Sequence, residues 1–143
     1  MKKTIFALLA ALVLGFGFSQ TAMVTGSFTG EGFSGGVELA TPQTGPVEGL
    51  FGATLDTENA FAYAGVRVQV NEVEDGYVYT ALRLGAFNPL SEVFTSPDAY
   101  GAYLGVGGLD RYSMVEGGVR VTTVDFSDYS VGFVVSVGIG SGR

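Results

Sequence analysis

Histidine and cysteine are absent from this chain of 143 residues. A chain without them has no serine–histidine triad, no cysteine nucleophile and no disulfide, and it lacks the ligands of most transition-metal sites. We therefore expect neither a metal nor another cofactor. Acid–base chemistry by carboxylates stays open on these grounds.

Basic residues are scarce as well. Lysine occurs only at positions 2 and 3, so residues 20–143 carry five arginines against 14 acidic residues and a net charge of about −9. Binding to nucleic acid needs clusters of basic residues on the protein surface. We therefore expect no nucleic-acid partner.

A long apolar run is missing beyond the N-terminal region. Lys2 and Lys3 are followed by the apolar segment 5–18, which is too short for a convincing membrane-spanning helix and is typical of a secretory signal. Residues 17–19 (Gly-Phe-Ser) form a small-x-small cleavage site, and cleavage after Ala22 is the alternative. The sequence thus predicts a signal peptide at 1–19 and a single domain at 20–143.

A two-residue alternation is the dominant pattern in the rest of the chain, and it is clearest over residues 129–140. Successive side chains of a strand point to opposite faces, so this segment would have one apolar face and one face of small residues. The apolar positions are Tyr129, Val131, Phe133, Val135, Val137 and Ile139. Twelve residues suffice for a strand that crosses a membrane at a tilt, which needs about 9–11 residues.

Alternation and turn residues predict eight strands with no competing helical period. They are expected at about 22–30, 33–41, 46–56, 60–70, 77–87, 99–108, 111–124 and 129–140. Residues 71–76 are predicted as an acidic turn, and residues 88–98 as the longest connection. The predicted fold is all-β, an eight-stranded antiparallel up-and-down β-barrel.

All charges in the middle of predicted strands fall on the less apolar face. The three acids are Glu38, Glu48 and Glu116, and the three bases are Arg67, Arg83 and Arg120. Four tyrosines, Tyr63, Tyr79, Tyr103 and Tyr112, are assigned to the same side. A water-facing sheet usually carries many more charges, often lysine. A balanced set of charges therefore favours a narrow, filled lumen, with the valine and leucine face towards lipid.

The same pattern allows a second architecture. A secreted soluble β-barrel would turn the valine and leucine face inward and hold a small apolar ligand there. A third hypothesis, a barrel enzyme acting on lipids, would need Glu38, Glu48 or Glu116 as acid and base; ion-paired filling of the lumen is preferred for these residues. We therefore expect no enzymatic activity.

Over residues 22–140 the alternation resembles the small eight-stranded bacterial outer-membrane barrels, the group with the OmpA and OmpX architecture. The resemblance implies insertion into the outer membrane with both termini in the periplasm, contact with membrane lipid and with the outer-membrane assembly machinery, and a monomer. It also implies an outer aromatic girdle of Phe33, Tyr100 and Tyr129. The family's last strand commonly ends in an aromatic residue, whereas this chain ends Ile-Gly-Ser-Gly-Arg. The implied function is structural or surface display, not a general pore.

Short hairpins also predict which residues face each other. A tight turn near residues 57–58 places Glu48 directly across from Arg67. The turn at 42–45 places Glu38 opposite Glu48 or two residues from it. Arg67 is then expected to join both carboxylates and to stack on Tyr79.

Overall fold

A computed structural model describes residues 21–92 and 97–140, which form eight strands and one short 3-10 helix. The strands are β1 (Thr21–Thr29), β2 (Gly32–Ala40), β3 (Val47–Leu55), β4 (Asn59–Val73), β5 (Gly76–Pro89), β6 (Ala99–Asp110), β7 (Ser113–Thr123) and β8 (Tyr129–Gly140), and the 3-10 helix η1 is Leu90–Glu92. The predicted signal peptide and part of the 88–98 connection lie outside the described residues. No described helix is long and apolar enough to cross a membrane.

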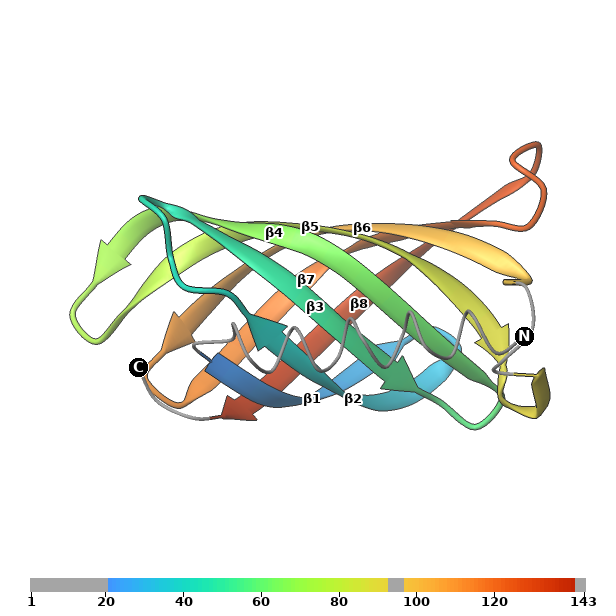
Figure 1. Cartoon of the computed structure of the whole chain (residues 1–143), viewed down its shortest axis with the longest axis horizontal. Coiled ribbons are helices and arrows are strands. Elements are labelled where there is room, and N and C mark those ends of the chain that lie inside the picture. The colour runs from blue at the N-terminus through green and yellow to red at the C-terminus, as the bar shows by residue number, and fades with distance from the viewer. Residues whose placement is uncertain (1–20, 93–96, 141–143) are drawn as a thin grey trace.

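The strands close into one antiparallel barrel in sequence order, as predicted (Figure 1). Closure is made by β1 and β8, which pair from Met23 opposite Gly140 to Thr29 opposite Val134. The alternating segment 129–140, which is β8, is therefore paired along both edges, with β1 on one side and β7 on the other.

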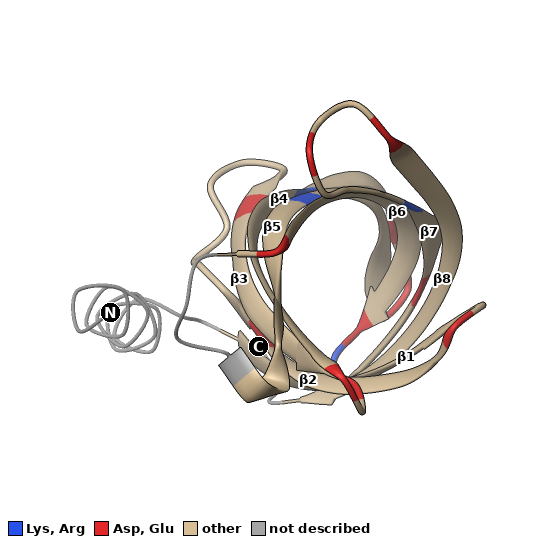
Figure 2. Ribbon diagram, turned by 90° about the vertical axis from the view of Figure 1, so that its right-hand side faces the viewer, with Lys and Arg blue, Asp and Glu red and all other residues tan. Residues whose placement is uncertain are grey.

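The two ends of the barrel differ. β1 begins and β8 ends at one end, which we call the terminus end, together with the β2–β3, β4–β5 and β6–β7 turns (Figure 1). The remaining four connections lie at the opposite end, which we call the loop end; they are β1–β2, β3–β4, β5–β6 and β7–β8. Acidic residues mark the turns of the loop end (Figure 2).

The predicted acidic turn at 71–76 is wrong in extent. β4 continues to Val73 and β5 begins at Gly76, so only Glu74 and Asp75 form the turn. The pairing of β4 with β5 shifts between Gln69 and Asn71, which is a β-bulge. Because a bulge inserts one unpaired residue, the strand continues past Val70 with its alternation reset, and a two-residue period cannot reveal this.

Three aspartates accept hydrogen bonds from the backbone of their own turns. Asp56, Asp110 and Asp125 each accept two backbone hydrogen bonds through Oδ1, from the residues two and three positions later. The donor–acceptor distances are between 2.7 and 3.1 Å. An aspartate in this position replaces backbone partners that the turn cannot supply. These acids therefore help to shape the hairpins.

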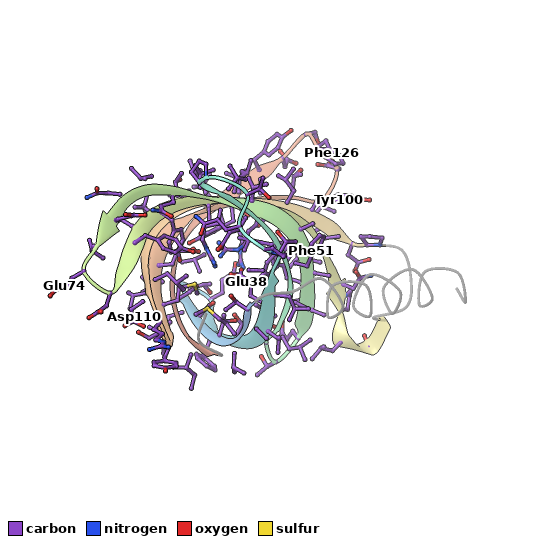
Figure 3. All side chains as sticks on the ribbon, turned by 60° about the vertical axis from the view of Figure 1, so that its left-hand side comes forward. Glu38, Phe51, Glu74, Tyr100, Asp110 and Phe126 are labelled. Atoms are coloured by element: carbon purple, nitrogen blue, oxygen red, sulfur yellow. The ribbon has the colours of Figure 1, made fainter. Side chains whose placement is uncertain are left out.

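Side-chain directions follow the predicted faces. The outward positions of β8 are strongly exposed, with Phe133 at 77% and Val131 at 68%. Inward residues are covered, and Figure 3 shows Glu38 inside the ring of strands. The apolar core lies within the barrel near the terminus end and consists of Met23, Ala40, Leu50, Tyr77, Tyr79, Ala81, Leu109 and Met114.

Candidate functional site: the charged lumen

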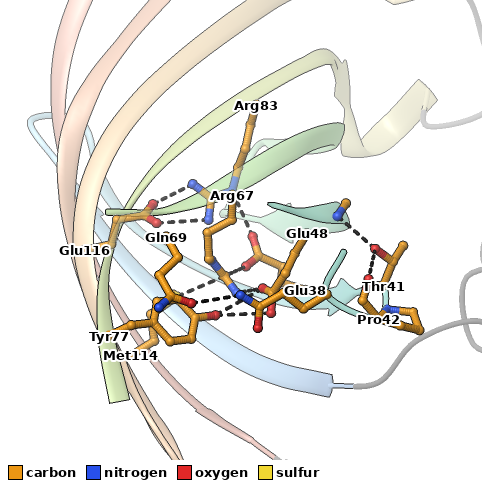
Figure 4. A network of polar contacts seen from close by, with 12 residues as sticks. Glu38, Thr41, Pro42, Glu48, Arg67, Gln69, Tyr77, Arg83, Met114 and Glu116 are labelled. Atoms are coloured by element: carbon orange, nitrogen blue, oxygen red, sulfur yellow. Dashed lines mark hydrogen bonds and ion pairs between the residues drawn. The ribbon is translucent and has the colours of Figure 1, made fainter. Parts of the chain in front are cut away.

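Five charged side chains from five strands meet in the middle of the lumen (Figure 4). We call Glu38, Glu48, Arg67, Arg83 and Glu116 the lumen network. Each is at least 94% buried, since the most exposed member, Arg83, retains 6% of its surface. Charged groups are removed from water at a large cost unless they are paired and hydrogen-bonded. The stability of this interior therefore depends on the pairing of these five side chains.

The lumen network is a continuous chain of ion pairs. Arg67 bridges two acids, with Nη1 3.0 Å from Glu48 Oε2 and Nη2 2.5 Å from Glu38 Oε1. Arg83 bridges Glu38, at 2.8 Å from Nε, and Glu116, at 2.5 Å from Nη1. A second donor of Arg83, Nη2, lies 3.1 Å from the other oxygen of Glu116, so this pair is a two-pronged fork. Glu38 is the shared acceptor that joins the two arginines.

Tyrosines complete the network. The Tyr63 hydroxyl donates to Glu38 at 2.9 Å, and the Tyr77 hydroxyl lies 3.2 Å from both oxygens of Glu48. Arg67 lies over the Tyr79 ring with 4.7 Å between Cζ and the centroid, as predicted, and Arg83 lies 5.1 Å from the centroid of Tyr103. Such cation–π contacts gain strength in a desolvated site.

Inward glycines make room for these rings. A Cβ at Gly52 would collide with the Tyr63 hydroxyl, and one at Gly107 would lie 2.6 Å from the Tyr79 hydroxyl oxygen. Tyr103 covers Gly105 and Gly118 in the same way. Part of the glycine content thus follows from the need to lay tyrosine rings flat against the inner wall.

The register explains how the acids reach Arg67. Glu48 is the direct partner of Arg67 across β3 and β4, as predicted. The prediction for Glu38 is wrong, because Glu38 faces Gly52, four residues from Glu48. The 41–46 connection is longer than a tight turn: Thr41 donates to the Gly49 carbonyl, and Thr44 pairs with Val47. Arg67 meets Glu38 across the lumen, not through neighbouring register positions.

Two residues that were predicted to fill the lumen, Tyr112 and Arg120, do not take part in the lumen network. Tyr112 sits in the β6–β7 turn with 58% of its surface exposed, so its assignment to the lumen is wrong; β7 begins only at Ser113. Arg120 does line the lumen, but it forms no ion pair with a described residue and lies over the Phe87 ring at 5.1 Å. It stands four residues closer to the loop end than Glu116 on the same strand. Tyr63, Tyr79 and Tyr103 face inward as predicted.

Residues that sequence reasoning did not single out also build the interior. Phe61 and Phe87 stack at 4.3 Å between centroids, and Phe61 is buried. The sulfur of Met114 lies 3.7 Å from Nη2 of Arg67. The alternation of β4 and β5 already places both phenylalanines on the inward face. An aromatic residue on a polar face does not by itself reveal which side chain it packs against.

The free space that remains in the middle of the lumen is small. A cavity of about 50 Å³ borders Glu38, Arg83, Glu116 and Arg120. A water molecule needs about 10–15 Å³ of this kind of volume, so this cavity has room for a few waters. Within the described residues, no group of three or more acidic side chains is arranged to hold a metal ion. All three lumen acids are engaged by arginine, which leaves none of them as an uncommitted general base.

The predicted girdle residues lie on the outside of the barrel. Phe33 is 57% exposed, Tyr100 39% and Tyr129 61%. Phe33 packs against Phe28 at 5.1 Å, Tyr100 stacks on Phe126 at 5.1 Å, and the Tyr129 hydroxyl donates to the Phe126 carbonyl at 2.9 Å. These aromatic side chains lie near the loop end, where β2 and β8 begin.

Comparisons with known proteins add little to this geometry. No protein-family model matches the chain, and no curated protein matches its sequence. One solved structure, from work described as the de novo design of transmembrane β-barrels, is similar over 84% of this chain and 92% of its own, with 11% identity and a TM-score of 0.48. The closed eight-stranded antiparallel barrel of this chain rests on its own strand pairing.

Proposed function

We propose that this chain is a small barrel of the bacterial outer membrane, with a lumen filled by side chains and a structural or surface-display role. One observation carries the proposal: in the described ranges 21–92 and 97–140, Asp110 at the end of β6 is the only charged residue at an outward position of a strand. The apolar outward side chains are widely exposed. Soluble monomers rarely expose contiguous apolar patches beyond a few hundred Å².

The apolar surface surrounds the barrel. It includes Val24 and Phe28 on β1, Phe51 on β3, Leu84 on β5, Leu104 and Val106 on β6, and Val131, Phe133 and Ile139 on β8. Each of these side chains is at least 41% exposed. Hydrocarbon lipid is the solvent in which such a surface is stable, and a closed barrel leaves no backbone group of its wall without a partner there.

The inside of the barrel supports the same proposal. The soluble alternative requires the valine and leucine face to turn inward around an apolar ligand, but the inward face carries the lumen network. An apolar exterior around a polar interior is the arrangement of membrane barrels. The filled lumen argues against a general pore, since eight strands leave an interior just wide enough for side chains.

The proposed orientation places the terminus end in the periplasm. An N-terminal signal peptide at 1–19 would deliver the chain there, and the assembly machinery would insert it as a monomer. The loop end would face outward, with its aromatic girdle of Phe33, Tyr100 and Tyr129 at the lipid–water interface. The 88–98 connection would then be displayed at the surface.

Cell fractionation tests the proposal directly. Membranes of expressing cells are washed with urea and then extracted with detergent. We expect the protein in the washed membranes and its release only by detergent, because the exposed apolar surface needs a lipid-like environment. Recovery in the aqueous periplasmic or secreted fraction would favour the soluble alternative.

A further inference from the structure

A cavity opens at the loop end above the lumen network. It has a volume of about 490 Å³ and is lined by Glu31, Asp56, Phe87, Arg120, Thr122 and Ser130, among others. We call it the vestibule. Its size, and its mixture of two phenylalanines, Phe87 and Phe133, with a few polar groups, are typical of sites for small molecules. The lumen network below it is buried and paired, so the vestibule is a cup with a closed floor.

Arg120 is the basic residue of this cup. Of the described arginines, Arg67 and Arg83 belong to the lumen network and Arg111 lies in a turn at the terminus end. The guanidinium of Arg120 lies over Phe87 and donates no hydrogen bond to a described residue. A planar guanidinium held by a ring presents its donors in a fork that matches an oxyanion.

Space is available beside Arg120. Its direct partner on β8 is Gly132, and a Cβ at this position would meet no atom within 4 Å. The inward glycines beneath the tyrosine rings are packed, whereas this one borders open volume that belongs to the vestibule. A ligand group can therefore approach the guanidinium from the β8 side.

The rim of the vestibule has the opposite charge. Glu31 and Asp56 line the same cavity as Arg120, and Glu58 lines its continuation towards β4. Asp56 uses Oδ1 for the backbone of its own turn, and Glu31 lies in the exposed β1–β2 turn. One arginine at depth and carboxylates at the rim form an electrostatic pattern with two signs.

We propose that the vestibule binds a small zwitterion, with an oxyanion on Arg120 and an ammonium group towards Glu31 and Asp56. A simple anion would meet the rim carboxylates, and a simple cation would meet Arg120 at the floor. Only a molecule with both charges satisfies both, and the Phe87 ring offers an apolar wall for the carbon chain between them. The proposal concerns the inside of the barrel and does not depend on lipid contact outside it.

Calorimetric titration of the full chain tests the proposal. The protein is folded in octyl glucoside, which is uncharged and contains no phospholipid. The probes are glycine, γ-aminobutyrate and ε-aminocaproate, with butyrate and butylamine as the two half-ligands. We expect one of the zwitterions to bind roughly tenfold or more tightly than either half-ligand, because a charged hydrogen bond adds about that much.

Variants locate the site. Arg120→Met and Gly132→Leu should each abolish saturable binding, the first by removing the fork and the second by filling the space beside it. Glu31→Gln should weaken the zwitterion roughly tenfold while leaving butyrate unchanged or stronger. Arg111→Met is the matched control, because Arg111 also lies over an aromatic ring, Tyr112 at 5.6 Å, but at the opposite end. Circular dichroism of each variant confirms that the barrel is folded.

The outcomes separate the possibilities. If butyrate binds as tightly as every zwitterion, or if no probe gives saturable binding, the proposal is overturned. Equal affinities for butylamine and every zwitterion would also overturn it, because the Arg120 guanidinium would then contribute nothing to binding. Repeating the titration in phosphatidylethanolamine vesicles distinguishes the source of the zwitterion: a loss of free-ligand binding there identifies a lipid headgroup as a competing occupant of the same site.

Discussion

Glu48 and Arg67 face each other directly across β3 and β4, and Arg67 Nη1 lies 3.0 Å from Glu48 Oε2 in the interior of the barrel. Strand register alone would place them together, and the burial of both side chains makes their contact costly to break. The Tyr77 hydroxyl also lies 3.2 Å from Glu48, but a hydroxyl cannot replace the positive charge of a guanidinium.

Removal of Arg67 should therefore destabilise the fold more than removal of a single acid. Arg67→Ala removes the ion pair between Arg67 and the buried Glu48, while Glu38 keeps Arg83. Breaking a buried pair from one side costs about 3–5 kcal/mol. Urea unfolding in detergent should show this loss, with smaller effects for Glu38→Gln and Glu48→Gln.

The double variant Arg67→Met with Glu48→Leu should recover part of that stability, because it removes the buried carboxylate of Glu48 together with the guanidinium. Arg111→Ala, in an exposed turn, is the control and should unfold like wild type. An unchanged urea midpoint for Arg67→Ala would mean that Arg67 is solvated, and the charged interior would then not contribute to stability.

The outward face is tested by single arginines. Leu82, Val66 and Val135 are outward residues with 42%, 41% and 52% exposure. Leu82→Arg, Val66→Arg and Val135→Arg should each impair folding into bilayers, since an arginine near the bilayer midplane costs about 2–4 kcal/mol. Glu31→Gln and Glu74→Gln, in turns, are the controls for this folding assay. Tolerance of all three arginines would contradict lipid contact.

The lumen network should also prevent steady conduction. Protein reconstituted into planar bilayers is expected to show no large, stable current, because buried side chains occupy the bore at the level of Glu38 and Arg83. The measurement is single-channel recording at several voltages. Porin-sized steps would show that the lumen network moves aside in the membrane.

The sequence predicted the strands and their faces well because both follow from a two-residue period and from turn residues. It also placed Glu48 opposite Arg67, since the β3–β4 connection is short. It failed where a local irregularity intervenes. The bulge at Gln69/Asn71 and the long 41–46 connection change register without changing composition. Arg120 was predicted among the charges that fill the lumen. It does face the lumen, but it lies four residues along β7 from Glu116 and takes no part in the lumen network.

The pH dependence of the β7–β8 turn follows from Asp125. A hydrogen bond from the Ser127 side chain and the backbone N–H groups of Asp128 and Ser127 lower the pKa of the Asp125 carboxyl to about 2. A carboxyl whose pKa is depressed by folding stabilises the turn above its unfolded pKa of about 3.9 and loses this effect as pH falls through the folded value. The turn should therefore loosen between about pH 4 and pH 2.

Carboxyl NMR of Asp125 measures this directly. We expect a titration midpoint near 2 in the folded protein and a higher midpoint in Ser127→Ala, which lacks the side-chain donor. A midpoint of about 3.9 in both proteins would mean that the turn hydrogen bonds do not persist in solution.

Two inward glycines should respond in opposite ways to a single methyl group. Gly52→Ala places a Cβ against the Tyr63 hydroxyl and 2.8 Å from the Val37 carbonyl oxygen, so the ring or the strand must shift. Because Tyr63 also donates to Glu38, a shift of the ring weakens the lumen network. Overpacking of this kind costs about 1–3 kcal/mol.

Gly132→Ala meets no atom within 4 Å and should be neutral or slightly stabilising, since alanine restricts the unfolded chain. Urea unfolding of the two variants under the same conditions decides the matter: equal midpoints would mean that Tyr63 does not lie against Gly52.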